Sequence, residues 1–110
     1  MQSQAKNILE LILDEIPFKV IQEYRFDKIR RFRFDYYIKL DNNKSLAIEF
    51  EGGAWSKGRH TRPKGYINDC TKYNLATSLN IPVLRYTSEH LNDPDKVKKE
   101  ILFTIENIEK

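Results

Sequence analysis

Two segments of alternating apolar residues, on either side of the turn sequence Asp41-Asn42-Asn43, constrain the fold more than any other feature of the chain. Aromatic and aliphatic residues occupy every second position over residues 32–40 and again over residues 46–50. This period of two predicts half-buried β-strands, and Asn and Asp favour the tight turn of a hairpin. We therefore expect an antiparallel hairpin over residues 32–51.

A three-residue turn fixes the register of this hairpin. Leu40 then pairs with Lys44. Asp35 falls opposite Glu49, and Glu51 becomes its diagonal neighbour on the same face. The same register also pairs apolar residues across the two strands: Phe34 with Phe50, Tyr36 with Ile48, and Ile38 with Leu46. A shift by one residue would break both patterns, so the apolar residues themselves predict that the acids gather.

The rest of the chain predicts helices and two further strands. Helical spacing indicates a helix over residues 4–15. Val20, Tyr24 and Phe26 alternate with polar residues and predict a strand with these three on one face. After a basic loop over 54–65 we expect a helix over 66–79, a buried strand over 81–86, and a helix from Asp93-Pro94 to about 108. The predicted fold class is α/β (α+β), a single domain over 1–110 with the order αβββαβα and a mixed sheet flanked by helices.

The composition fits one ordinary globular domain. Of the 110 residues 40% are hydrophobic, which argues against disorder, and the net charge of +3 weakly favours a polyanionic partner. Cys70 is the only cysteine, so no internal disulfide can form; we expect it in the core, in a reducing cytoplasm. The N-terminal residues resemble neither a signal peptide nor a membrane span, so no membrane partner is expected.

Three carboxylates on one face of a hairpin repel one another, and a divalent cation relieves that repulsion. Asp35, Glu49 and Glu51 supply oxygen ligands, which Mg²⁺ prefers where a phosphate completes its coordination. A single acid of this kind would be better explained as a solvated strand residue. Three are harder to explain that way, because acidic residues are poor strand formers. The acids therefore indicate a metal centre.

A cationic loop follows directly beyond Glu51. Its ten residues from Trp55 to Lys64 include His60 and no acid. Alone, such a loop is best interpreted as a solvated surface segment. Beside an acidic centre, it favours binding of a phosphodiester backbone. The residues expected to contact DNA are Lys57, Arg59, Arg62 and Lys64.

These residues resemble the PD-(D/E)XK nuclease superfamily, whose motif is an acid on one hairpin strand and an acid, any residue and a lysine on the next. Asp35 matches the first acid and Glu49-Phe50-Glu51 the second part, with Glu51 in place of the lysine. The segment over 31–87 looks like small phage-type endonucleases and, more distantly, the very-short-patch repair endonucleases. The cysteine pattern of the latter's zinc site is absent, so neither zinc nor mismatch specificity is carried over.

The resemblance implies a restriction-endonuclease-like core and a Mg²⁺-dependent DNA endonuclease, with Mn²⁺ able to substitute, in a bacterial or phage-infected cell. Asp35, Glu49 and the backbone carbonyl of Phe50 would bind the ion. Glu51 would help to bind it or would position the attacking water.

Three more residues are candidates for catalysis. Lys72 would replace the motif lysine, although a surface ion pair with Asp69 explains it equally well. His60 would orient or deprotonate the water, or bind phosphate. Glu23 is preferred over Glu10 as an upstream acid.

Alternative functions remain open. A Holliday-junction or other structure-specific resolvase on the same fold would require a homodimer. A DNA-binding module without catalysis is supported by the missing motif lysine. An HNH-type nuclease using His60 and Asn74 would leave the paired acids of the hairpin unexplained.

Overall fold

The computed structural model describes residues 3–52 and 63–110. Within these ranges the predicted order of helices and strands is confirmed, and a short 3₁₀ helix is added before the last helix. The elements are α1 (Gln4–Glu15), β1 (Val20–Asp27), β2 (Phe32–Lys39), β3 (Ser45–Phe50), α2 (Pro63–Ser78), β4 (Val83–Tyr86), η1 (His90–Asn92) and α3 (Pro94–Glu109).

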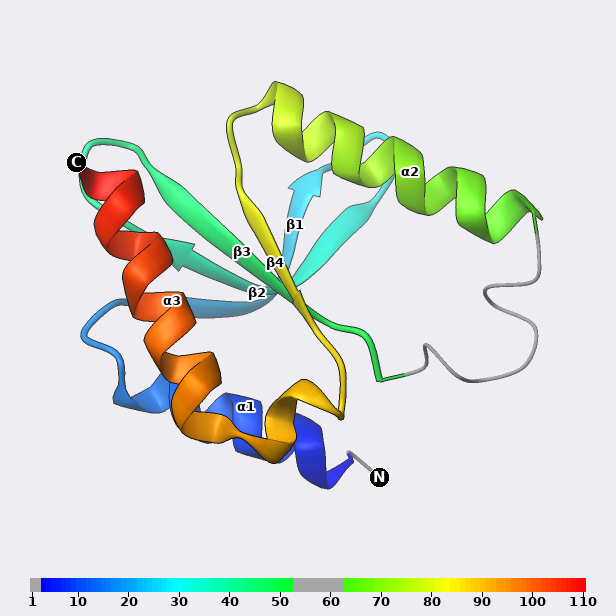
Figure 1. Cartoon of the computed structure of the whole chain (residues 1–110). Helices are drawn as coiled ribbons and strands as arrows, with labels where there is room; N and C mark the ends of the chain where they lie inside the picture. Colours follow the sequence, from blue (N-terminus) through cyan, green and yellow to red (C-terminus); the bar gives the residue numbers. More distant parts are fainter. Residues whose placement is uncertain (1–2, 53–62) are drawn as a thin grey trace.

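The four strands form one mixed sheet in the order β1-β2-β3-β4. β1, β2 and β3 pair antiparallel, whereas β4 runs parallel to β3. In Figure 1, α1 and α3 lie together on one side of the sheet, and α2 lies on the other side. The chain is therefore an α+β protein with a four-stranded sheet between two helical layers.

The predicted register of the β2–β3 hairpin is confirmed from the turn as far as Tyr36↔Ile48, but the predicted pairing of Phe34 with Phe50 is wrong, because these two side chains pack in different hydrophobic clusters. Four residue pairs form the ladder, from Lys39↔Ser45 to Tyr36↔Ile48. The turn is closed as expected, because the Leu40 N–H donates to the Lys44 carbonyl at 2.9 Å. Asn42 and Asn43 both have a φ of 60°, a conformation that Asn tolerates better than most residues. The ladder ends one position before Asp35 and Glu49.

Two hydrophobic clusters lie on opposite faces of the sheet. The larger packs the sheet against α1 and α3, and it contains Leu9, Ile12, Tyr36, Ile38, Leu46, Ile48, Tyr86, Leu91 and Ile101 among others. The smaller lies under α2 and is built on Phe34, Ala47 and Ala76, with Tyr24, Phe26 and Tyr37 packed against it. Ala47 and Ile48 thus face opposite clusters, as the alternation along β3 predicts.

The prediction that Val20, Tyr24 and Phe26 share one face is wrong. Val20 packs against the larger cluster, and the other two pack against the smaller one. Between them Glu23 has a φ of 50°, which rotates the strand and breaks the alternation.

The paired strand β2 changes face at the same level. Tyr24 still pairs with Phe34. Phe34 belongs to the smaller cluster and stacks on Phe26 with ring centroids 4.0 Å apart, whereas Tyr36 belongs to the larger cluster. The expected common face of Phe34 and Tyr36 is therefore also wrong. Asp35 lies between them, at the point where the strand changes face.

The helices differ from prediction at two points. α2 begins at Pro63 rather than at Tyr66, so Lys64 lies in its first turn and not in a loop. Proline suits that position because its missing N–H would have no helical partner there. Cys70 is exposed and not a core residue, because α2 buries only Ala76. The predicted cap of α3 is confirmed, since the Asp93 carboxylate accepts from the Lys96 N–H.

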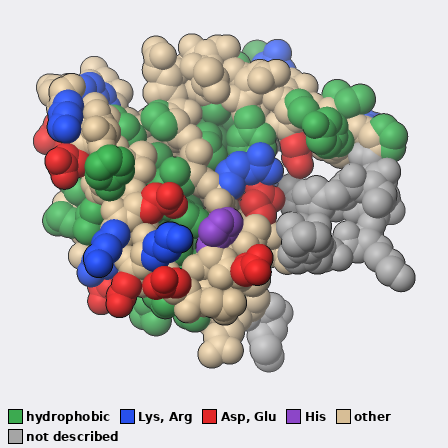
Figure 2. Space-filling model, in the orientation of Figure 1, with side chains coloured by type: hydrophobic (Ala, Val, Ile, Leu, Met, Phe, Trp, Pro, Cys, Tyr) green, Lys and Arg blue, Asp and Glu red, His purple; other side chains and the backbone are tan. Residues whose placement is uncertain are grey.

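The surface carries charges of both signs. Figure 2 shows acidic and basic side chains interleaved over α3 and its neighbourhood on the face in view. Within residues 3–52 and 63–110, no helix has the length and apolar character needed to cross a membrane.

Candidate functional site

Asp35 and Glu49 are joined where the β2–β3 ladder ends. The Asp35 N–H donates to Oε2 of Glu49 at 2.7 Å, and the Phe50 N–H donates to Oδ2 of Asp35 at 2.8 Å. The two carboxylates thus bind backbone N–H groups at the open end of the hairpin, and these groups would otherwise need other partners. The sequence predicted that these acids lie together, and the structure places them together, through side chains rather than through a ladder pair.

Lys72 reaches this pair of acids from α2. Its ammonium nitrogen is in direct contact with Oε1 of Glu49 and lies 5.6 Å from the centre of the Phe34 ring. The side chains of Lys72 and Glu49 are only 16% and 7% exposed. The cation that replaces the motif lysine in the sequence-based hypothesis therefore lies at the acidic centre in the structure.

Glu51 lies in the same layer, and other side chains bind it. Its Oε1 accepts from Nε of Arg85 at 2.8 Å and from the Tyr73 hydroxyl at 3.3 Å. The same hydroxyl lies 3.1 Å from Oε1 of Glu49. Since one phenolic proton is available, Tyr73 shares it between the two carboxylates. Arg85 stacks on Tyr73, with its guanidinium carbon 4.3 Å from the ring centre.

Sequence reasoning missed Arg85 and undervalued Tyr73. The signal for Arg85 was a charged residue inside an otherwise apolar strand, which suggests a partner on the neighbouring strand. In the parallel β3–β4 ladder Arg85 is paired with Glu49. Tyr73 had been explained by helix packing alone, and only the placement of α2 over the sheet shows that its hydroxyl reaches the acids.

The electrostatics of the site are dominated by burial. Burial raises the pKa of Glu49, and the negative charge of Asp35 adds to this effect. The contact with Lys72 and the hydrogen bond from Asp35 oppose the shift without cancelling it. Burial and the charges of Glu49 and Glu51 also raise the pKa of Tyr73, so this phenol stays protonated and remains a donor.

The remaining predicted site residues are dispersed. Glu23 is exposed on β1. It lies across from Asp35, between the paired positions Gln22↔Tyr36 and Tyr24↔Phe34. Glu10, on α1, accepts from the Tyr36 hydroxyl at 2.6 Å. Lys64 is exposed at the start of α2. Four further predicted residues lie outside the described part of the chain: Lys57, Arg59, His60 and Arg62.

The donor atoms at the acidic centre are compatible with Mg²⁺. Within the described residues, no group of three or more His, Cys, Asp and Glu side chains is arranged to hold a metal ion. Mg²⁺ commonly uses one or two carboxylates, with water and substrate phosphate completing six oxygen ligands. Asp35 and Glu49 supply such a pair of oxygen donors, held together by the hydrogen bonds at the hairpin end.

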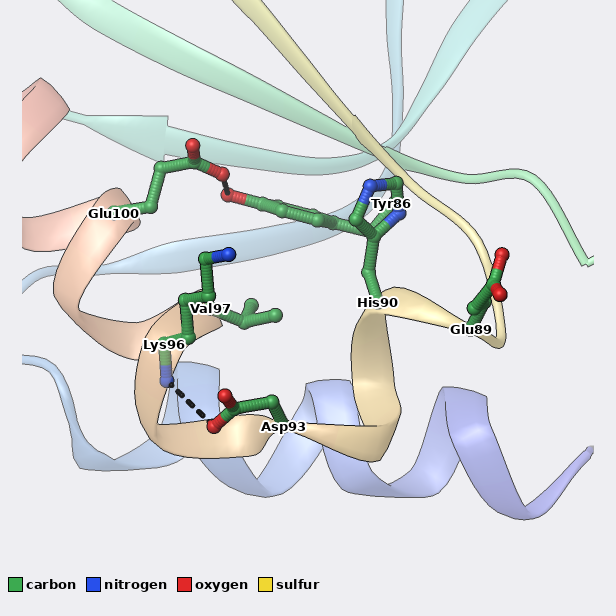
Figure 3. Close-up of a pocket in the computed structure, with 7 residues that line it drawn as sticks. All are labelled: Tyr86, Glu89, His90, Asp93, Lys96, Val97 and Glu100. Carbon is green, nitrogen blue, oxygen red and sulfur yellow. Dashed lines mark hydrogen bonds between the residues drawn. The ribbon is translucent and has the colours of Figure 1, made fainter.

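A separate hollow of about 410 Å³ lies between the end of β4, η1 and α3 (Figure 3). Four of the polar side chains that line it, those of Tyr86, His90, Asp93 and Glu100, make contacts that explain them structurally. The Tyr86 hydroxyl donates to Glu100 at 2.8 Å, and Nδ1 of His90 accepts from the Thr87 N–H at 2.9 Å. Asp93 caps α3. We therefore assign no chemistry to this hollow.

No protein-family model, curated protein or solved structure gives a significant match to this chain. The acidic centre and the motif residues that form it therefore carry the functional information.

Proposed function

We propose that this protein is a Mg²⁺-dependent endonuclease that hydrolyses DNA phosphodiester bonds on a restriction-endonuclease-like form of the α+β fold. The observation that carries the proposal is the convergence of Asp35, Glu49 and Lys72. Two acids from a hairpin and a lysine from the following helix meet although 37 positions separate the first from the last in the sequence (35 to 72). Two carboxylates and an ammonium group are the charges that metal-assisted phosphodiester hydrolysis uses.

Asp35 and Glu49 would hold the ion, with the Phe50 carbonyl as a third oxygen donor. Bound Mg²⁺ supplies a Lewis acid that lowers the pKa of water and offsets the charge developing on the phosphate. The hydrogen bonds from the backbone N–H groups of Asp35 and Phe50 fix the orientation of the carboxylates before substrate arrives. Such preorganisation avoids reorienting the ligands during the reaction.

Lys72 takes the place of the lysine that the motif carries two positions after the second acid. Its positive charge, held at Glu49, supports the ionised state of that carboxylate and would offset negative charge on the phosphate under attack. In the overall reaction water attacks phosphorus, one bond between phosphorus and a sugar oxygen breaks, and the leaving oxygen takes up a proton.

DNA is the proposed partner. Lys64 lies exposed in the first turn of α2, the helix that also carries Lys72 to the acids. Together with Lys57, Arg59 and Arg62 it would bind the phosphate backbone and give affinity without base specificity. His60 keeps its proposed role beside the attacking water or a phosphate.

A DNA-binding module without catalysis is the second candidate, and one contact favours it. Because the Lys72 ammonium already contacts Glu49, that carboxylate has a counter-cation without any metal. In such a module, the acids and Lys72 would stabilise the fold and the cationic residues alone would serve binding.

Cleavage of supercoiled plasmid and of a labelled branched DNA tests these proposals, with Mg²⁺, Mn²⁺ or EDTA. Asp35→Asn and Glu49→Gln are the informative variants, because each removes the negative charge and keeps a side-chain oxygen. That oxygen can still accept from the Phe50 N–H at position 35 and from the Asp35 N–H at position 49. Asp41→Asn, in the exposed turn, is the matched control. We expect metal-dependent cutting by wild type and control, and a loss of roughly 100-fold or more in the two variants.

If the protein binds DNA but cuts none with any of the metals, the endonuclease proposal is refuted and the proposal of a DNA-binding module is supported. A strong preference for the branched substrate would identify a structure-specific enzyme. Equal cutting by wild type and both variants would remove the acidic centre from the reaction.

A further inference from the structure

Arg85 is held on two sides at the edge of the acidic centre. Its Nε donates to Oε1 of Glu51 at 2.8 Å, and its guanidinium lies over the Tyr73 ring. Glu51 is only 9% exposed, so the acid that binds Nε is itself fixed in the protein interior. A stacked and hydrogen-bonded arginine loses little further side-chain freedom when it binds a ligand.

The Arg85 side chain is nevertheless 46% exposed. A guanidinium group has five N–H donors in a planar fork, and the bond to Glu51 uses one at Nε. The terminal nitrogens are the part of the group suited to paired hydrogen bonds with two phosphate oxygens. Arg85 is also paired with Glu49 in the parallel β3–β4 ladder, and Glu49 is one of the residues proposed to hold the ion.

We propose that Arg85 binds a DNA phosphate beside the acidic centre, and that Glu51 and Tyr73 are positioning residues that orient its guanidinium. This inference rests on the proposed nuclease function and gives position 51 a role. Glu51, which stands at the place of the motif lysine, orients Arg85 from the neighbouring strand β4. The positive charge that the motif lysine would supply comes from Lys72 on α2. Burial alone would lower the pKa of Arg85, but the hydrogen bond to Glu51 and the nearby charges, Asp69 included, outweigh it and raise that pKa, so the guanidinium stays ionised.

Binding of a short DNA duplex in EDTA at several salt concentrations tests this role apart from catalysis. Each phosphate contact contributes about one unit to the slope of log K against log salt. We expect Arg85→Met to lower that slope by about one. Arg85→Lys keeps the positive charge without the planar fork of the guanidinium, so it should retain the slope. Lys98→Met, which removes one positive charge from α3, is the matched control and should leave the slope unchanged.

Removing Arg85 alone leaves the buried Glu51 without its ion-pair partner, which destabilises the single variant. The double variant Arg85→Met/Glu51→Gln removes both charges and should fold and show the same reduced slope. Glu51→Gln and Tyr73→Leu keep the arginine but loosen it, because the first weakens the bond at Nε and the second removes the ring on which the guanidinium stacks. In them we expect a higher KM for cleavage, with kcat changed less, because positioning of the phosphate is what they weaken.

The outcomes separate the two proposals. A wild type that neither binds nor cuts DNA would overturn the nuclease proposal, and this inference with it. A wild type that binds and cuts DNA, with an unchanged salt slope in Arg85→Met/Glu51→Gln, would overturn the role of Arg85 alone. A reduced slope in that variant with an unchanged slope in Lys98→Met would support it.

Discussion

Asp35 and Glu49 are linked by a side chain of each residue bound to the backbone of the opposite strand. Oε2 of Glu49 accepts from the Asp35 N–H, and Oδ2 of Asp35 accepts from the N–H of Phe50, the residue after Glu49. The two bonds continue the connection between β2 and β3 after the regular ladder has ended. The acids therefore complete the hairpin as well as form the candidate active site, and their removal should affect both stability and activity.

The ion pair between Lys72 and Glu49 predicts a coupled effect on stability. Lys72→Met leaves Glu49 buried without its cation and should lower the free energy of unfolding by on the order of 3 kcal/mol. The double variant Lys72→Met/Glu49→Gln should recover most of this loss. Urea unfolding measures both, and Lys98→Met, which breaks the exposed pair with Glu15, should cost at most about 1 kcal/mol. If the stability losses of Lys72→Met and Glu49→Gln, measured singly, simply added in the double variant, the pairing of Lys72 with Glu49 would be contradicted.

Burial of Glu49 also predicts a pH dependence. Its pKa in the folded chain is raised above the ordinary value of 4.5, so folding favours the protonated form. The stability contributed by this group is fully present below the unfolded pKa and is lost as pH rises through the folded pKa. Glu49→Gln does not titrate, so its stability relative to wild type should increase as pH rises through that window. Urea midpoints of both proteins across the acid range check this, and a difference independent of pH would refute it.

The positive φ of Glu23 predicts an unusual order of tolerated substitutions. Glycine adopts this conformation without steric cost, whereas a β-branched residue does so poorly. Glu23→Val should lower the free energy of unfolding by about 1–2 kcal/mol, and Glu23→Gly should be close to wild type. The same two substitutions at Arg25, an exposed β1 residue without positive φ, are the control. There Arg25→Gly should be less stable than Arg25→Val. Thermal unfolding of the four variants distinguishes the cases.

The cap of α3 predicts a local loss of stability. Asp93→Ala removes the acceptor for the Lys96 N–H and should cost about 1 kcal/mol. Asp95→Ala, two residues further on in the first turn and without a capping bond among the described contacts, is the control and should cost less. Chemical denaturation of the two variants checks this. Equal losses would mean that charge near the helix start matters more than the capping bond.

The sequence predicted the hairpin register and the meeting of Asp35 with Glu49 because local patterns determine them. Lys72 was one candidate for the motif lysine, and its contact with Glu49 depends on the packing of α2 over the sheet. Apolar alternation and a turn of known residue types fixed the pairing of β2 with β3. The change of face at Glu23 was not predictable, since no residue type in the strand marks a positive φ at a glutamate. Arg85 was missed for a different reason: its partner Glu51 lies on a strand brought beside it only by the crossover through α2.

The attachment of α2 has a consequence for the order in which the protein opens. α2 buries only Ala76 and packs on the smaller cluster, whereas α1 and α3 bury three residues each in the larger one. Elements with few buried apolar contacts open at the lowest free energy. Amide hydrogen exchange should therefore be fastest in α2 among the three α-helices described. Each such opening would withdraw Lys72 and Tyr73 from the carboxylates together, so exchange rates along this helix would report how often the acidic centre is taken apart.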